Sequence, residues 1–326
     1  MKIKLDISYN LDLLCFLNSM TGNKFIVDYH KEAYEKFYPF VGDEVKHKMK
    51  RLHRLNVSHL LAPGAVTALS SMHDFDKREL LSMLGSQTEM KQSISKTKYG
   101  ESLFMRLMLL RLINRYAIPL VQDLENAGFK DYWHSERLPL VQERLNGLDE
   151  YMEQYSKDAE RLFNRFIKMD ASDFTIYVCS FANPQGIKLC GNNMIVDYVY
   201  DNKTILEILT HEPFHPPYDF KAVRKSVKTL ARKPWVKEAF KKQTPEHRYA
   251  PMSFYIEENI VDALGKYVAA QLGLSADPKK ELAERDNDSH VISPRFYDYL
   301  CENEKDASQS FEDYFTNFVD SVDSIK

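Results

Sequence analysis

The chain has 326 residues, of which 44% are hydrophobic and 28% are charged, close to the averages for globular proteins. This apolar content is enough to build a sizeable core, so the composition excludes a wholly disordered or low-complexity chain. The 44 Lys and Arg residues nearly balance the 47 Asp and Glu residues, and the formal net charge is -3. Without an overall basic field, we expect neither a nucleic acid nor a membrane as partner.

The first twenty residues do not resemble a secretory signal. Asp6 and Asp12 interrupt them, and an unbroken apolar centre is missing. No window reaches the ~18 consecutive apolar residues that a membrane helix needs. The sequence therefore predicts a cytoplasmic location, although a chain exported with its leader already removed would look the same. The four cysteines are widely spread without CxxC spacing and are expected to be small buried or half-buried residues.

The first half of the chain is predicted to be helical. Residues 9–40 carry apolar and aromatic side chains at helical spacing. Residues 101–127 form a second helical run, with Pro119 as a kink and Gly128 near its end. In residues 139–169, apolar residues recur every three or four positions, which predicts one long amphipathic helix.

After residue 170 the pattern changes to short strands. Residues 174–181 are β-branched and aromatic, and turn residues separate them from apolar segments at 187–190 and 194–200. Three short strands joined by tight turns predict an antiparallel meander, whose edge at residues 190–198 would pair with an extended peptide. Helices are predicted at 254–272, 295–301 and 311–322.

Residues 211–215 read His-Glu-Pro-Phe-His. Side chains four positions apart on a helix lie one above the other, so the imidazoles of His211 and His215 would face a common point. Two neutral imidazoles suit Zn²⁺, and Glu212 would then lie where it can take a proton from the attacking water. A pentad of this kind can also arise by chance.

A catalytic zinc site needs a third protein ligand, and the predicted helix at 254–272 offers acidic residues. Glu258 and Asp262 share one helical face, so Glu258 can bind the metal while Asp262 accepts a hydrogen bond from the outer ring N–H of a ligand histidine. Glu257 is the alternative third ligand, but its side chain points about 100° around the helix axis from that of Glu258 and therefore pairs poorly with Asp262. The alternative is that these acidic residues only stabilise the helix start.

The order of these features resembles the gluzincin metallopeptidases, in which an edge strand precedes the HExxH helix and a glutamate helix follows. The resemblance covers roughly residues 170–265 and is carried by the pentad and by Glu258-x-x-x-Asp262. It implies one Zn²⁺ per chain, bound by His211, His215 and Glu258. It also implies that Glu212 is the general base and that Asp262 accepts a hydrogen bond from a ligand histidine.

The whole chain is also similar to a bacterial family of unknown function with a predicted gluzincin-type site. The matching stretches are 11–38, 258–264 and 311–318. The resemblance implies an α+β, mostly helical fold: a helical N-terminal region at 1–170 and a zincin-like catalytic region at 171–326. The second region would have a thermolysin-like core with a small antiparallel sheet, and both would pack as one continuous unit.

Proline inside the pentad departs from the gluzincin pattern. Pro213 lies within it, and Pro216 and Pro217 follow directly. Each proline removes a backbone donor and disfavours a helical conformation of the residue before it. We expect both imidazoles still to meet over a single turn, less rigidly than in an unbroken helix. The predicted function is a zinc metallopeptidase, a hydrolase of peptide or protein substrates. The alternatives are a catalytically inactive relative that acts as a binding protein, and a metallohydrolase with a non-peptide substrate.

Two further features are left open by the sequence. Stabilising the transition state requires a donor aimed at the oxyanion, and the candidates are His247, Tyr249 and Tyr255. The other histidines, His290 among them, show no ligand spacing. Residues 221–248 contain ten Lys or Arg residues and two acidic ones. They form either a docking face for an acidic partner or a solvated segment balanced by the acidic tail at 301–326.

Overall fold

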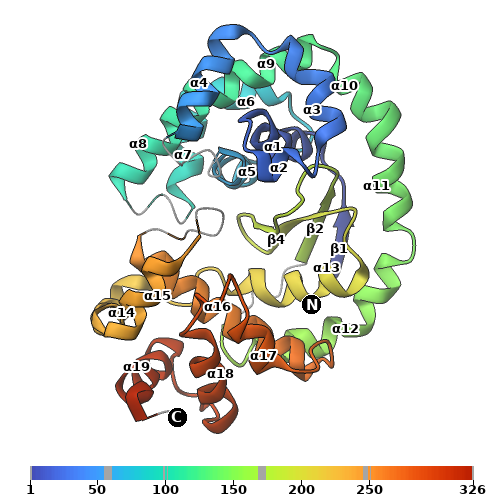
Figure 1. The fold of residues 1–326 in the computed structure, drawn as a ribbon. Coiled ribbons are helices and arrows are strands. Elements are labelled where there is room, and N and C mark those ends of the chain that lie inside the picture. The colour runs from blue at the N-terminus through green and yellow to red at the C-terminus, as the bar shows by residue number, and fades with distance from the viewer. Residues whose placement is uncertain are drawn as a thin grey trace. The chain divides into compact units, whose positions relative to one another are not determined.

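The structure is a computed structural model that describes residues 2–54, 61–97, 100, 102–167, 174–244, 249 and 251–324. It is mostly helical with one small four-stranded sheet, so the predicted α+β class is confirmed (Figure 1). The chain divides into two compact units: unit 1 is Met1–Lys2, Tyr151–Ser172 and Asp201–Lys326, and unit 2 is Ile3–Glu150 and Asp173–Tyr200. This division differs from the predicted boundary at residue 170, because the strand segment groups with the N-terminal helices.

The sheet belongs to unit 2 and is mixed. Its strands are β1 (Ile3–Asp6), β2 (Phe174–Cys179), β3 (Ile187–Lys188) and β4 (Asn193–Asp197), in the order β1-β2-β4-β3. β1 and β4 both run parallel to β2, and only β3 and β4 are antiparallel.

The predicted antiparallel meander is therefore wrong. β2 and β4 are buried at almost every position, as is typical of inner strands of a parallel sheet, so β4 pairs directly with β2. The two-residue β3 lies on the outer side of β4. The segment 190–198, predicted as a substrate-binding edge, is not a free edge in its middle: β4 pairs with β2 on one side, and Met194 and Ile195 pair with β3 on the other.

Helix α1 lies inside unit 2, with other helices of that unit around it (Figure 1). Its buried Asp12 accepts hydrogen bonds from Trp133 Nε1 at 2.7 Å, from Ser180 N at 2.8 Å and from Phe181 N at 3.0 Å. A buried carboxylate requires such donors, and here they tie α1 to the end of β2. The helices of unit 2 are α1 (Tyr9–Met20), α2 (Lys24–Val27), α3 (Lys31–Phe37), α4 (Asp43–Arg54), α5 (Leu61–Ser70), α6 (Leu80–Gly85), α7 (Gln87–Ser95), α8 (Leu103–Leu112), α9 (Ile118–Asn126), α10 (Phe129–Tyr132) and α11 (Leu138–Leu145).

Prolines and glycines interrupt the long predicted helices. The run 101–127 contains a π-helical turn, Ile113–Ala117, directly before Pro119, which lacks the N–H that a regular helix needs there. It ends at Gly128, whose φ is 79°. The single helix predicted for 139–169 is wrong, because Gly147 adopts a φ of 77° between α11 and α12 (Leu148–Phe163).

Unit 1 is organised around the 20-residue helix α16 (Met252–Gln271), which packs against α13 and α18 (Figure 1). At Gly265 the backbones of α16 and α13 approach so closely that a Cβ atom would lie 2.9 Å from His211 Cα. Most of α12, from Tyr151 on, also belongs to unit 1. The other helices of this unit are α13 (Asn202–His211), α14 (Phe220–Arg232), α15 (Pro234–Lys242), α17 (Pro278–Ala283), α18 (Ser293–Glu302) and α19 (Phe311–Ser321).

Two further observations concern the whole described chain. No helix within the described ranges is long and apolar enough to cross a lipid bilayer. All four cysteines are free: Cys15 and Cys179 are buried, Cys190 is half-buried and Cys301 is exposed. Exposure of Cys301 differs from the expectation that the cysteines are at least half-buried.

Candidate metal centre

Helix α13 carries the first residues of the pentad. The side chain of Asp201 caps its start by accepting a hydrogen bond from Thr204 N at 2.7 Å. The helix ends at His211, and Glu212–Phe214 form a 3₁₀ turn, because Pro213 has no N–H for a helical hydrogen bond. His215 is extended, with φ -91° and ψ 116°, and donates its N–H to the Glu212 carbonyl at 3.1 Å.

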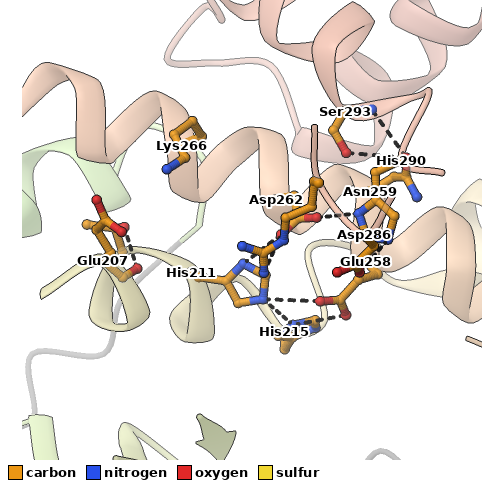
Figure 2. Close-up of polar contacts among 12 residues, drawn as sticks. Glu207, His211, His215, Glu258, Asn259, Asp262, Lys266, Asp286, His290 and Ser293 are labelled. Carbon is orange, nitrogen blue, oxygen red and sulfur yellow. Dashed lines mark hydrogen bonds and ion pairs between the residues drawn. The ribbon is translucent and has the colours of Figure 1, made fainter. Parts of the chain in front are cut away.

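The two imidazoles meet in spite of the prolines. His211 Nε2 lies 3.1 Å from His215 Nε2, and the ring planes are inclined by 64°. Glu258 reaches both rings from α16: its Oε1 is 3.4 Å from His211 Nε2, and its Oε2 is 3.6 Å from His215 Nε2. Figure 2 shows the three side chains pointing toward one another.

These separations fit a single small cation. The ligand atoms of His211, His215 and Glu258 all lie within 4.8 Å of one another, and the group could hold a metal ion. Around a tetrahedral zinc ion with bonds of about 2.0–2.1 Å, neighbouring ligand atoms are about 3.3–3.4 Å apart. The N–N separation of 3.1 Å, and the N–O separations of 3.4 Å to Glu258 Oε1 and 3.6 Å to Oε2, are close to this value.

A carboxylate faces the outer nitrogen of each imidazole. His211 Nδ1 lies 3.3 Å from Asp262 Oδ1, and His215 Nδ1 lies 3.3 Å from Glu257 Oε1. When each Nδ1–H donates to its carboxylate, each Nε2 keeps a lone pair directed at the centre, which is the tautomer a metal ligand needs. Glu257, the rival ligand in the sequence interpretation, therefore lies behind His215 rather than beside the centre.

Asp262 is itself held by two cationic partners. Its carboxylate lies 2.5 Å from His290 Nδ1 and 3.4 Å from a guanidinium nitrogen of Arg285. His290 Nε2 in turn faces Asp286 Oδ2 at 3.2 Å. Figure 2 shows His211, Asp262, His290 and Asp286 close together in this chain of contacts.

The segment that supplies these partners has an unusual backbone. Asp286, Asn287 and Asp288 adopt φ values of 47°, 55° and 59°, in the left-handed region that non-glycine residues rarely occupy. Each such residue costs roughly 1 kcal/mol, so three in succession need compensating contacts. The contacts of Arg285 and His290 with Asp262 meet that need. Sequence reasoning missed His290, since no spacing rule links it to the pentad.

Burial and neighbouring charges shift the pKa values of the ligands. Burial alone would lower the pKa of His211, but its hydrogen bonds with Asp262 and Glu258 raise that pKa to about 10. Burial alone would raise the pKa of Glu258, but the hydrogen bond with His211 and the charge of His215 lower it to about 2. A divalent cation that binds here must therefore displace the proton of His211, because a coordinated imidazole nitrogen carries none.

The residues predicted from the sequence to act as general base or oxyanion donor differ in their polar contacts. Glu212 is 8% exposed, and no described residue forms a hydrogen bond or ion pair with its carboxylate. The buried Tyr255 hydroxyl donates to the Ser289 carbonyl, which commits it to the core. The Tyr249 ring lies 5.5 Å from the His290 ring, and burial and the nearby carboxylates raise its pKa well above the ordinary value. His247 lies outside the described residues.

Comparisons with protein-family models, with curated proteins and with solved structures find no match. What the centre does must therefore be inferred from its own chemistry. Its firm feature is a group of two imidazoles and one carboxylate that could hold a metal ion.

Proposed function

We propose that the protein is a zinc-dependent metallopeptidase of the gluzincin type, with one zinc ion bound by His211, His215 and Glu258. The observation that carries this proposal is the convergence of the three ligand atoms within 4.8 Å, at separations suited to a tetrahedral site. Two imidazoles and one carboxylate are the donor set of many zinc hydrolases, in which a fourth position stays open. When bound there, zinc supplies Lewis acidity that polarises a carbonyl and lowers the pKa of water to about 7.

The surrounding residues have distinct roles in this proposal. Asp262 and Glu257 accept hydrogen bonds from the Nδ1–H groups of His211 and His215, and so orient each Nε2 toward the metal. Glu212 accepts a proton from the attacking water and passes it to the leaving amine. That role is supported by its position between the two histidines and by the lack of a polar partner for its carboxylate among the described residues.

Tyr249 is the best-supported donor for the oxyanion. Burial and the charges of Glu258, Asp286 and Asp262 raise its pKa, so the phenol stays protonated and can donate a hydrogen bond. Tyr255 is less suited because its hydroxyl already donates to a backbone carbonyl. The proposed substrate is a peptide or protein chain.

One observation favours the alternative, a catalytically inactive relative that only binds metal or a partner. Glu212 keeps helical backbone angles, but Pro213 ends α13 and residues 212–214 form a 3₁₀ turn, so His215 is extended instead of continuing the helix as in an unbroken HExxH motif. The two functions share the metal ligands and differ only in what Glu212 does. A variant of Glu212 therefore separates them.

The test is a Glu212→Gln variant, assayed for cleavage of a mixed peptide library by mass spectrometry and for zinc content in parallel. The proposal predicts cleavage by the wild-type protein, loss of at least about a hundredfold in rate in the variant, and unchanged zinc content. Cleavage that survives the substitution would contradict the assigned base. Zinc binding without cleavage by the wild type would favour the inactive relative.

A further inference from the structure

Helix α14 carries a row of cations on the side opposite its buried face. Val223, Val227 and Leu230 pack into the core of unit 1. The opposite face presents four exposed residues that recur at positions i, i+4, i+7 and i+11. This row, named here the basic stripe, consists of Lys221, Lys225, Lys228 and Arg232.

Further cations extend the basic stripe. Residues 220–244 contain nine Lys or Arg residues and one acidic residue, in a chain with a net charge of -3. Arg224 flanks the stripe on α14, and Lys237, Lys241 and Lys242 are exposed on α15. Two consecutive helices of unit 1 therefore carry a local excess of positive charge.

The acidic tail does not neutralise the basic stripe. Lys233, which is outside the stripe, pairs with Asp323 at 2.6 Å. None of the four stripe side chains forms an ion pair or a hydrogen bond with any residue in the described ranges. Internal balance by the tail, one of the two sequence interpretations, therefore does not account for these four charges. Unpaired like charges in a row repel one another, and an anionic partner would relieve that repulsion.

We propose that the basic stripe binds an acidic segment of the polypeptide substrate. This inference rests on the proposed function and adds a substrate preference to it. α14 follows the ligand His215 closely in the chain, and the intervening Tyr218 is buried near Glu257, which contacts His215. The stripe therefore begins at Lys221, six residues after His215 in the chain, and continues along one helix.

The spacing of the stripe suits an extended chain. Lys221 and Arg232 lie about 16 Å apart along the axis, with one cation per turn of about 5.4 Å. Alternate side chains of an extended peptide lie about 6.6 Å apart on one side. A substrate with acidic residues at every second position can thus place a carboxylate near each cation over this length.

A nucleic acid or a membrane fits the basic stripe less well than an acidic peptide does. Three of its four cations are lysines, which offer point charges rather than the planar fork of arginine that recognises phosphate. The apolar face of α14 is buried in the core, so this helix cannot insert into a bilayer as an interfacial helix does. The exposed positions between the cations, Ala222 and Thr229, provide no ring on which a base could stack.

The test measures binding of fluorescein-labelled peptides by anisotropy, using one peptide with glutamate at alternate positions and its glutamine counterpart. The variant combines Lys221→Gln, Lys225→Gln, Lys228→Gln and Arg232→Gln. A matched control, with the same change in net charge in unit 2, combines Lys24→Gln, Lys31→Gln, Lys91→Gln and Lys130→Gln, all at exposed positions. Circular dichroism establishes that both proteins remain folded.

The wild type and the control should bind the glutamate peptide on the order of tenfold more tightly than the glutamine peptide, because each exposed ion pair contributes a factor of about two. The stripe variant should lose that preference, and added salt should weaken binding of the glutamate peptide to the wild type and to the control. Equal binding of both peptides, or a preference retained by the stripe variant, would overturn the proposal. So would tighter binding of single-stranded DNA or phosphatidylserine vesicles, which would assign the stripe to that partner. Measurements with and without EDTA keep this result independent of the metal centre.

Discussion

Replacing Gly265 by Ala introduces a methyl group where α16 and α13 touch. The new Cβ would lie 2.9 Å from His211 Cα, 3.1 Å from Thr210 O and 3.2 Å from His211 Cβ. Carbon atoms in contact prefer about 3.5–4.0 Å, so α13 must move away by roughly 0.5–1 Å. The obstacle is largely backbone, which cannot rotate aside as a flexible side chain can.

The magnitude follows from two opposing terms. Overpacking of this kind costs about 1–3 kcal/mol, while Ala is better than Gly inside a helix by about 1 kcal/mol. We expect a net loss of about 0–2 kcal/mol in the free energy of unfolding, which corresponds to a decrease of up to a few degrees in Tm. The displacement also separates His211 from Glu258, and ligand positions outside about 0.2 Å of the required distances weaken a metal site, so zinc affinity should fall about tenfold or more.

The assay combines thermal unfolding followed by circular dichroism with zinc competition against a chelating dye. Gly85→Ala is the matched control, because a Cβ at Gly85 would meet nothing within 4 Å. That variant should be as stable as the wild type or up to about 1 kcal/mol more stable, with unchanged zinc affinity. If Gly265→Ala behaves like Gly85→Ala in both measurements, the close approach of α13 and α16 at the metal centre is refuted.

Three further predictions concern buried carboxylates and protons. Asp262→Asn should weaken zinc binding by about 10–100-fold in the same competition assay, because Asp262 orients His211; an unchanged affinity would contradict that role. Zinc binding should tighten as the pH rises from 6 toward the pKa of His211, about 10, because the imidazole must lose its proton to bind the metal. If zinc affinity measured over this pH range shows no such trend, His211 is not a ligand. Asp12→Ala should lower the free energy of unfolding, measured in urea, by about 3 kcal/mol or more. The reason is that the donors on Trp133, Ser180 and Phe181 would be left buried without an acceptor. A loss below about 1 kcal/mol would mean that these donors bind water instead.

Local patterns predicted much of the fold and the ligand set. The apolar spacing of α13, the strand composition of β2 and the face shared by Glu258 and Asp262 depend on neighbours in sequence, and the structure has these elements. The pentad could be read in the same way, because even a 3₁₀ turn brings residues four apart close together.

Features that depend on distant pairing could not be predicted. β1 pairs with β2 in a register that matches Ile3 with Phe174, and nothing near either residue encodes that contact. His290 reaches Asp262 only because the left-handed turn at 286–288 brings it back to α16. Glu257 contacts the outer nitrogen of His215 because His215 has an extended backbone after Pro213. A prediction that assumes a regular helix through the pentad does not give this contact.

The most direct test of the central claim is the zinc content of the purified protein, measured by elemental mass spectrometry beside a His215→Ala variant. His73→Ala is a suitable control, because that exposed histidine is remote from the centre in sequence and pairs with its neighbour Asp74. The proposed site predicts close to one zinc per chain in the wild type and in the control, and almost none in His215→Ala. Absence of zinc from the wild type, even after incubation with the metal, would contradict the claim that His211, His215 and Glu258 form a zinc site.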